Sequence, residues 1–265
     1  MGWLSVGGGR LLEQGVTVDL PVGVPRCEVL RYLGLPADSA VGPGLSGPLA
    51  AMINAAIAWA TESLRPRGLF RLVGLTQPGP DQDGLTLALP GEPRLASCDV
   101  AALLAGATYA ALWAVTVGPG LDERLAELTA AGEITGAAAL DAVGSAAAEQ
   151  AAEAMHGHLA ALAWQRGFVA TGRFSPGYGD FGLVHQRVFA EALDLDRIGV
   201  TLTPSLLLTP QKSITAVLGW RRRPDDAAPG DALSGDEVCG SRANGGRCQA
   251  CTVRECTYRS PGDPR

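Results

Sequence analysis

The sequence predicts an α+β fold with a largely antiparallel sheet. Hydrophobic residues make up 47% of the 265 residues, which is enough to build a sizeable core. Segments with helical periodicity are interleaved irregularly with short segments of β type. The regular β-α-β units of a doubly wound parallel sheet are not recognisable in this order, so antiparallel pairing is favoured.

The N-terminal third contains two predicted helices and two predicted strands. The segment PRCEVLRYLGL has helical spacing and reaches Gly34, which suits a left-handed C-cap. A longer helix is expected between Ser46, a suitable N-cap, and Pro66, because apolar residues line one face of that segment. FRLVGL and LTLAL are then short apolar runs on either side of a turn-rich segment, which predicts two strands.

The middle of the chain is dominated by helices around one buried strand. Ser97 is expected to cap a short helix of small residues, and the aromatic and β-branched residues of TYAALWAVTVG predict a buried strand. LDERLAELTAAG is a further predicted helix. Residues 134–167 predict a much longer Ala-rich helix, and Gly144-Ser145 is the expected point of any break.

The C-terminal part divides into folded chain, linker and tail. One helix, LVHQRVFAEALDL, precedes three predicted short strands that end at Trp220. Residues 221–238 are charged and rich in Pro and Gly, so we expect a flexible linker in which the three arginines 221–223 are solvated. The predicted division is a domain over 1–220, this linker, and a Cys-rich tail over 239–265.

Composition excludes several classes of partner. The formal net charge of -6 argues against nucleic acid, whose binding requires clustered Lys and Arg. No apolar stretch is long enough to span a membrane, and the N-terminal residues lack the pattern of a secretory signal. We therefore expect a cytoplasmic protein whose six cysteines are thiols or metal ligands rather than disulfides.

The motif RFSPGY carries the strongest local indication of a ligand. Pro176-Gly177 suits the centre of a type II turn, which would fix Arg173 relative to Tyr178. A guanidinium can bind a carboxylate through two hydrogen bonds, and a tyrosine ring can contact a cation or cover an adenine. The pair suits an amino-acid-like cationic ligand, and an ordinary surface loop is the alternative interpretation.

Beyond this motif, the sequence resembles the activation (reactivation) domain of cobalamin-dependent methionine synthase, and most closely its free-standing relatives. The resemblance rests on RFSPGYGDF with the segment that follows it, on EVLRYLG, and on AVTVGPGLDERLAEL with ALDAVGSAAAEQAAE. These motifs occur in consistent order from about Cys27 to Trp220. The resemblance implies a curved, helmet-like α+β domain that binds S-adenosylmethionine in a shallow site.

The resemblance also implies which residues hold the ligand. It assigns the methionine carboxylate to Arg173 and the nucleoside to the main chain and ring at Phe174, Ser175 and Tyr178. A helix glutamate that faces the ligand corresponds to Glu149, with Glu153 one turn later as the alternative. An N-terminal aspartate and an aromatic residue within SITAVLG, both expected in the family, have no counterpart here, which predicts weak affinity.

The tail indicates a second chemistry. Cys239, Cys248, Cys251 and Cys256 can supply four thiolates to one site, which suits tetrahedral zinc or a [4Fe-4S] cluster equally well. A reduced, disordered tail is the alternative. The two other cysteines, Cys27 and Cys98, lie in apolar helical contexts and are expected to be buried.

The function that the resemblance implies is binding of S-adenosylmethionine and support for reductive methylation of cobalamin on a partner methionine synthase or other corrinoid protein. No catalytic acid or base is expected, because the sulfonium of S-adenosylmethionine is already an activated methyl donor and the reduced cobalt of cobalamin is the nucleophile. An iron-sulfur cluster in the tail would supply an electron to the cobalt. The alternatives are a non-catalytic module that binds a corrinoid protein and an activator of another corrinoid methyltransferase.

Overall fold

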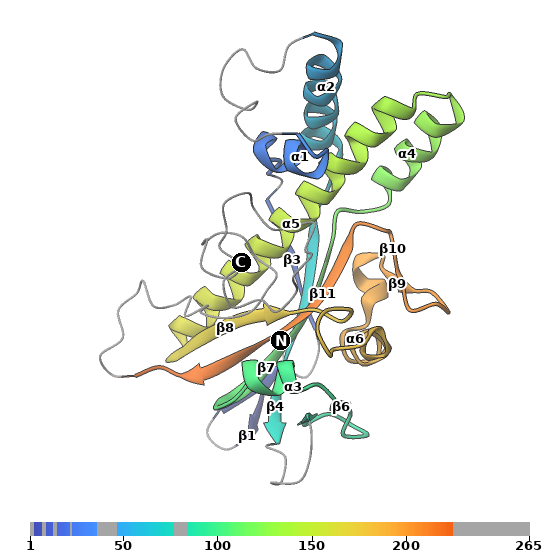
Figure 1. Ribbon diagram of the computed structural model, residues 1–265. Coiled ribbons are helices and arrows are strands. Elements are labelled where there is room, and N and C mark those ends of the chain that lie inside the picture. The colour runs from blue at the N-terminus through green and yellow to red at the C-terminus, as the bar shows by residue number, and fades with distance from the viewer. Residues whose placement is uncertain are drawn as a thin grey trace, which may run out of the picture.

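A computed structural model describes residues 3–6, 9–12, 15–21, 23–35, 47–76 and 84–224, and it combines helices with a curved antiparallel sheet (Figure 1). The helices are α1 Arg26–Tyr32, α2 Pro48–Ser63, α3 Cys98–Leu103, α4 Gly120–Ala130, α5 Ile134–Gln165 and α6 Gln186–Leu193, with 3-10 turns η2 Leu183–His185 and η3 Leu195–Ile198. The strands are β1 Trp3–Val6, β2 Gly9–Leu12, β3 Val16–Asp19, β4 Arg67–Thr76, β5 Leu85–Leu87, β6 Arg94–Leu95, β7 Ala107–Thr116, β8 Phe168–Phe174, β9 Thr201–Leu202, β10 Leu208–Thr209 and β11 Ser213–Arg222. The α+β prediction is therefore confirmed.

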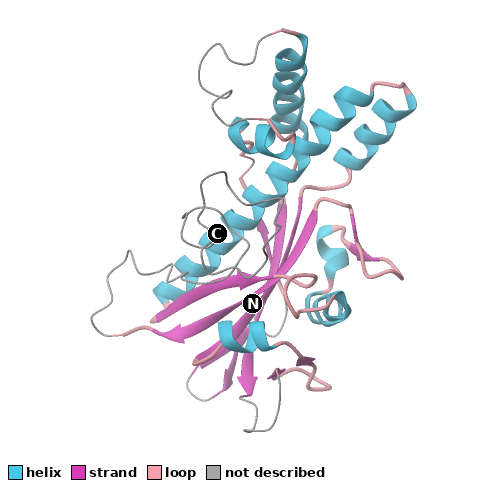
Figure 2. Ribbon diagram, viewed as in Figure 1, coloured by secondary structure: helices cyan, strands magenta, loops and turns pink. Residues whose placement is uncertain are grey.

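The main sheet has seven strands, in the order β6-β5-β4-β7-β11-β8, with β3 paired to β4. All of its pairings are antiparallel. β7 and β11 form its centre; β7 is buried along almost its whole length and β11 from Thr215 to Trp220, as expected for strands rich in aliphatic and aromatic residues. Helices cover the sheet on both faces (Figure 2).

Alternate side chains of the central strands enter two separate cores. On β7, Trp113 packs in the core beneath α5, whereas Leu112 packs in the core shared with α3 and α6. This alternation is the period of two that a strand imposes on its side chains. α5 therefore covers one face of the sheet, and α3 and α6 cover the other (Figure 1).

A third core joins α1, α2 and α4 to the N-terminal half of α5. The expected break at Gly144-Ser145 does not occur, because α5 is continuous over Ile134–Gln165. A Cβ atom at Gly144 would lie 2.2 Å from Leu121 Cδ2, so the glycine admits the α4 side chain against the α5 backbone. Close helix packing, rather than a bend, accounts for this glycine.

Three further expectations need correction. The strand β8 was not predicted, and it places Arg173 inside a strand rather than on the turn. The arginine run is not solvated linker: β11 extends to Arg222, Arg221 Nη2 donates to the Leu103 carbonyl at 3.0 Å, and Arg223 lies over the Trp164 ring at 4.4 Å. These cations pack against the folded chain through their long side chains.

The two cysteines within the described helices are exposed, not buried. Cys27 is the second residue of α1 and Cys98 is the first residue of α3, and both lie on helix faces that look away from the cores. Among the residues that the structure describes, no helix is long and apolar enough to cross a membrane. The N-cap residue of α2 is Gly47 and not the expected Ser46. Ser46 itself, the predicted linker from residue 225 onward and the whole Cys-rich tail lie outside the described residues.

Candidate functional site

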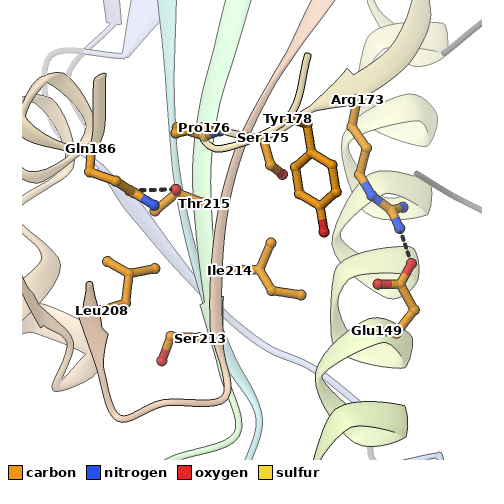
Figure 3. A pocket seen from close by; sticks show the side chains of 10 residues that line it. All are labelled: Glu149, Arg173, Ser175, Pro176, Tyr178, Gln186, Leu208, Ser213, Ile214 and Thr215. Carbon is orange, nitrogen blue, oxygen red and sulfur yellow. Dashed lines mark hydrogen bonds and ion pairs between the residues drawn. The ribbon is translucent and has the colours of Figure 1, made fainter. Parts of the chain in front are cut away.

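A cavity of about 210 Å³ lies where β8 ends beside the start of β11 (Figure 3). β8 pairs with β11 only from Val217 to Arg222, so the first residues of β11 have β7 on one side and the cavity on the other. The cavity is lined by Glu149, Arg173, Ser175, Pro176, Tyr178, Gln186, Leu208, Ser213, Ile214 and Thr215. Five elements, α5, β8, α6, β10 and β11, and one loop therefore converge on it.

A β-bulge directs Arg173 toward this cavity. Leu218 of β11 pairs with Arg173, but Trp220, two residues later, pairs with Ala170. β8 thus holds one residue more than β11 over this interval, which is the definition of a bulge. Because strand side chains alternate between faces, the extra residue places Arg173 on the same face as Ala170, toward α5.

Thr171 stabilises the bulge through its hydroxyl group. Its Oγ1 accepts a hydrogen bond from the Gly219 backbone N–H at 2.8 Å and donates to the Gly172 carbonyl at 2.8 Å. Thr171 is buried, so this side chain satisfies a backbone donor that water does not reach. The orientation of the Arg173 side chain therefore depends on Thr171, which does not line the cavity.

Arg173 is the buried cation of the site. Its side chain is 6% exposed, and its Nη2 lies 2.5 Å from Glu149 Oε1. Its Nη1 lies 3.1 Å from Glu153 Oε1 but makes no hydrogen bond within the described chain. Glu149 and Glu153 are four residues apart on α5 and so lie on one helical face. The guanidinium is thus held from one side and keeps a buried donor for a further acceptor.

Burial raises the pKa of the Glu149 carboxyl above its ordinary value. The positive charge of Arg173 lowers this pKa and the neighbouring Glu153 raises it, but desolvation is the largest effect. Two carboxylates around one guanidinium leave this end of the cavity with an excess negative charge when both are ionised. A cationic group on a ligand would offset that charge.

The loop after β8 forms the predicted turn. Gly177 has φ +98°, and the Tyr178 N–H lies 3.4 Å from the Ser175 carbonyl, as in a type II turn with proline at its second position. Gly177 N–H donates to the Phe181 carbonyl at 2.6 Å, which closes the loop. Tyr178 is 58% exposed and its ring lies across the cavity mouth beside Arg173 (Figure 3).

Asp180 anchors this loop to the N-terminus of α3. Its carboxylate accepts hydrogen bonds from the Ser97 hydroxyl and from the Cys98 N–H at 2.6 Å, and the Ser97 bond is the main reason that the pKa of Asp180 is lowered. In return, Asp99 Oδ2 accepts from the Asp180 N–H at 3.2 Å. Gly179 has φ +51°, and a Cβ atom there would lie 2.1 Å from Asp99 Oδ2, so a side chain at this position would displace the Asp99 carboxylate from this contact.

His185 holds the far end of the same loop. Its Nε2 accepts from the Ala96 N–H at 3.1 Å, and its Nδ1 lies 2.9 Å from the Gly182 carbonyl, to which it donates in the neutral tautomer. Its ring lies 4.4 Å from that of Phe181. Both ring nitrogens are used within the protein, so His185 positions the loop.

The opposite wall of the cavity is uncharged. Gln186 begins α6, and its Oε1 accepts a hydrogen bond from Thr215 Oγ1 at 2.7 Å. Both residues are buried, and they face Arg173 and Glu149 across the cavity (Figure 3). Sequence reasoning missed this wall, because the two residues are far apart in the chain and meet only through the pairing of β11 with β7.

The structure brings together most of the residues that the sequence analysis selected. Glu149, Arg173, Ser175 and Tyr178 line the cavity, and Glu153 adjoins it through Arg173. Phe174 places its side chain in the core beside Phe181, so only its main chain is near the site. Among the described residues no group of His, Cys, Asp or Glu could hold a metal ion; the four tail cysteines lie outside them.

Comparison with known proteins gives a structural relative only. No protein-family model and no curated protein sequence matches this chain. Among solved structures, a crystal structure of the MetH reactivation domain bound to AdoHcy is similar, with a TM-score of 0.59 and 15% sequence identity over 82% of each chain. At this identity the similarity establishes the fold: the chain has the curved α+β architecture of that reactivation domain.

Proposed function

We propose that the cavity binds S-adenosylmethionine and that the protein presents its methyl group to a cobalamin carried by a partner methionine synthase or other corrinoid protein. The observation that carries this proposal is the buried Arg173 with Glu149 at one end of an open cavity. The similar reactivation domain was solved with AdoHcy, the demethylated form of the same molecule, which supports the choice of ligand.

The charges of the ligand suit those of the site. The methionine part of S-adenosylmethionine carries a carboxylate, an ammonium group and a sulfonium. Arg173 Nη1 is a buried donor without a hydrogen bond in the described chain, and a carboxylate would satisfy it. Glu149 would pair with the ammonium group, and the excess negative charge around Arg173 would favour the sulfonium.

The shape of the site suits transfer to a partner. A cavity of about 210 Å³ is small beside the roughly 300–1,000 Å³ pockets that enclose drug-sized ligands, so this ligand would extend to the surface. Tyr178, which lines the cavity and is 58% exposed, places part of its ring surface at the mouth. An open, partly apolar mouth lets a large cofactor on another protein approach the methyl group.

The chain needs to supply position rather than acid-base groups in this reaction. A bound S-adenosylmethionine would supply an activated methyl group that a reduced cobalt on the partner could take with its own electron pair, while the methyl–sulfur pair stays on sulfur, so no proton transfer would be needed. Holding donor and acceptor in line is itself a large contribution to rate. Arg173, Glu149 and the anchored loop are the residues that would hold the donor.

Calorimetric titration with S-adenosylmethionine tests the binding step. Wild-type protein should bind, and Arg173→Ala should weaken binding by roughly a hundredfold, because a charged hydrogen bond is lost and Glu149 and Glu153 lose their partner. Arg124→Ala, which removes an exposed arginine of α4, is the matched control and should bind normally. Wild-type protein that does not bind would refute the proposal.

Methyl transfer separates the proposal from a non-catalytic binding module. Labelled S-adenosylmethionine is mixed with wild-type protein, a reductant and a corrinoid protein, and label on the cobalt is followed. Transfer that requires Arg173 supports the proposed function. Tight association with the corrinoid protein but no transfer would favour the module, and transfer only to a corrinoid protein outside methionine synthesis would favour the other methyltransferase.

For the tail we propose a metal centre held by Cys239, Cys248, Cys251 and Cys256, either zinc or an iron-sulfur cluster. The proposal rests on four thiols within a short stretch of sequence. Metal analysis and visible absorption of anaerobically purified protein distinguish the two, since only a cluster brings iron and colour. Metal-free protein would refute it, and Cys251→Ser should remove whichever metal is present.

A further inference from the structure

The uncharged end of the cavity contains a polar group that the proposed function has not used. Gln186 is only 6% exposed and lines the cavity. Its Oε1 is occupied by the Thr215 hydroxyl at 2.7 Å. Its Nε2 makes no hydrogen bond to any residue in the described part of the chain, yet it is not among the fully enclosed polar atoms.

The amide nitrogen therefore opens onto the cavity. A buried amide that hydrogen-bonds through one atom and leaves the other without a partner is costly unless water or a ligand completes it. Thr215 fixes the amide, since its own side chain is buried on β11 and its hydroxyl donates to the amide oxygen. The direction of Gln186 Nε2 is thus fixed by a buried residue of the sheet and not by a flexible surface side chain.

The two ends of the cavity select different chemistry. The end at Arg173 and Glu149 is ionic, whereas Gln186 and Thr215 on the opposite wall offer a neutral donor beside the aliphatic side chain of Leu208 (Figure 3). A neutral donor beside an aliphatic surface suits a flat heterocycle or sugar with hydrogen-bond acceptors, and does not suit a charged group.

We propose that Gln186 is a specificity-determining residue, whose Nε2 donates a hydrogen bond to an acceptor atom on the nucleoside of the bound ligand. This inference rests on the proposed function, because it takes the amino-acid part of the same ligand to lie at Arg173. Thr215 is a positioning residue that acts through Gln186. The ligand then spans the cavity from its ionic wall to its amide wall.

Titration with AdoHcy tests this assignment, because the stable thioether contains the same nucleoside. Gln186→Met keeps the length of the side chain and removes the donor, and it should weaken AdoHcy binding about tenfold. Gln165→Met, at the exposed end of α5, is the matched control and should bind as wild type. Circular dichroism and melting temperature verify that each variant is folded.

Two further variants separate the assignment from a general loss of structure. Thr215→Val leaves Gln186 in place but frees its amide, and should weaken binding about threefold. Glu149→Gln changes the other end of the cavity. The factors by which Glu149→Gln and Gln186→Met each weaken AdoHcy binding should therefore multiply in the double variant. If Gln186→Met does not fold, Thr215→Val alone decides.

The outcomes are distinct. Folded Gln186→Met that binds AdoHcy within about twofold of wild type would overturn the role of Gln186 while leaving the proposed function intact. An AdoHcy analogue whose purine lacks the N6 amino group but keeps its acceptor atoms should lose affinity for Gln186→Met by the same factor as AdoHcy does. If Gln186→Met binds this analogue as well as the wild type does, Gln186 accepts a hydrogen bond from N6 instead of donating one, which would also overturn the proposed role of Gln186. Wild-type protein that binds no AdoHcy would refute the proposed function and this inference together.

Discussion

The two ends of the cavity are built by different means. At the ionic end, a buried arginine from β8 is held by two carboxylates from α5 and aimed by a β-bulge. At the amide end, one hydrogen bond between α6 and β11 fixes a single neutral donor. The difference shows that placing a charge in a desolvated site requires partners and backbone support, whereas placing an amide requires one neighbour.

The strongest test of this comparison replaces two buried threonines, Thr171 in the bulge that orients Arg173 and Thr215 at the amide end. Thr171→Val should lower the free energy of unfolding by about 1–3 kcal/mol, because the buried Gly219 N–H loses its acceptor. It should also weaken ligand binding by more than tenfold, since the bulge no longer fixes Arg173. Urea denaturation and calorimetry measure the two effects.

Thr215→Val is the matched control, the same change at another buried position of the sheet. It removes only the hydroxyl that donates to Gln186 Oε1, and the amide lines the cavity, where water can replace that donor. The free energy of unfolding should therefore fall less than in Thr171→Val. Equal changes in the free energy of unfolding would show that the hydrogen bond in the bulge stabilises the fold no more than the bond at the amide end does.

Glu149→Gln tests the ionic end directly. The variant keeps the size of the side chain but removes the charge that would pair with the ammonium group, and we expect binding to weaken roughly tenfold. Glu191→Gln, a change of the same kind at an exposed position of α6, should leave binding unchanged. If Glu149→Gln binds the ligand as tightly as the wild type does, Glu149 does not pair with the ammonium group.

The raised pKa of Glu149 predicts that stability and affinity change in opposite directions with pH. Between the ordinary value of 4.5 and the higher value in the folded protein, the folded state binds more protons than the unfolded state. The free energy of unfolding should therefore fall as pH rises through this window. Affinity should rise through the same window, because the ammonium group pairs with the ionised carboxylate.

Glu149→Gln again supplies the comparison, because it lacks this titration. The charged groups that act on Glu149 are Arg173, Glu153, Arg31 and Glu28, and all of them remain in the variant. Parallel pH profiles of the wild type and the variant, for both unfolding and binding, would contradict the assignment of the shift to Glu149.

Smaller effects are expected at the mouth. Tyr178→Ala should leave stability within about 0.5 kcal/mol of wild type, because the side chain is 58% exposed, and should weaken binding about threefold by removing a ring over the ligand. Calorimetry and thermal melting measure both. A large loss of stability would mean that the ring supports the loop rather than the ligand.

Glu153→Gln should have the smallest effect and the opposite sign. Glu153 competes with a ligand carboxylate for Arg173 Nη1, so its removal should tighten AdoHcy binding about twofold, a modest change because its side chain is 36% exposed. Weaker binding by this variant would show that Glu153 contacts the ligand as Glu149 does.

The sequence predicted features whose causes are local. Ser97 caps α3 through its own hydroxyl, and Pro176-Gly177 forms the type II turn, because each depends on residues within one turn of chain. At the ionic end the local motif indicated Arg173, whereas Glu149 was assigned only through the resemblance to the reactivation domain. The resemblance to the reactivation domain supplied the fold, which the solved structure supports.

Features that depend on register could not be predicted. The meeting of Gln186 with Thr215 and the flip of Arg173 toward α5 both follow from how β11 pairs with its neighbours. One extra residue in β8 decides which face Arg173 occupies, and no local pattern marks that residue. Gly144 was misread for the same reason, because only the packing of Leu121 explains it.

The most direct test of the account is a crystal structure of the complex with AdoHcy. The account predicts the carboxylate within hydrogen-bonding distance of Arg173, the ammonium group at Glu149, and a nucleoside acceptor at Gln186 Nε2. A ligand bound in the reverse direction, or outside this cavity, would contradict the division of the site into an ionic and an amide end.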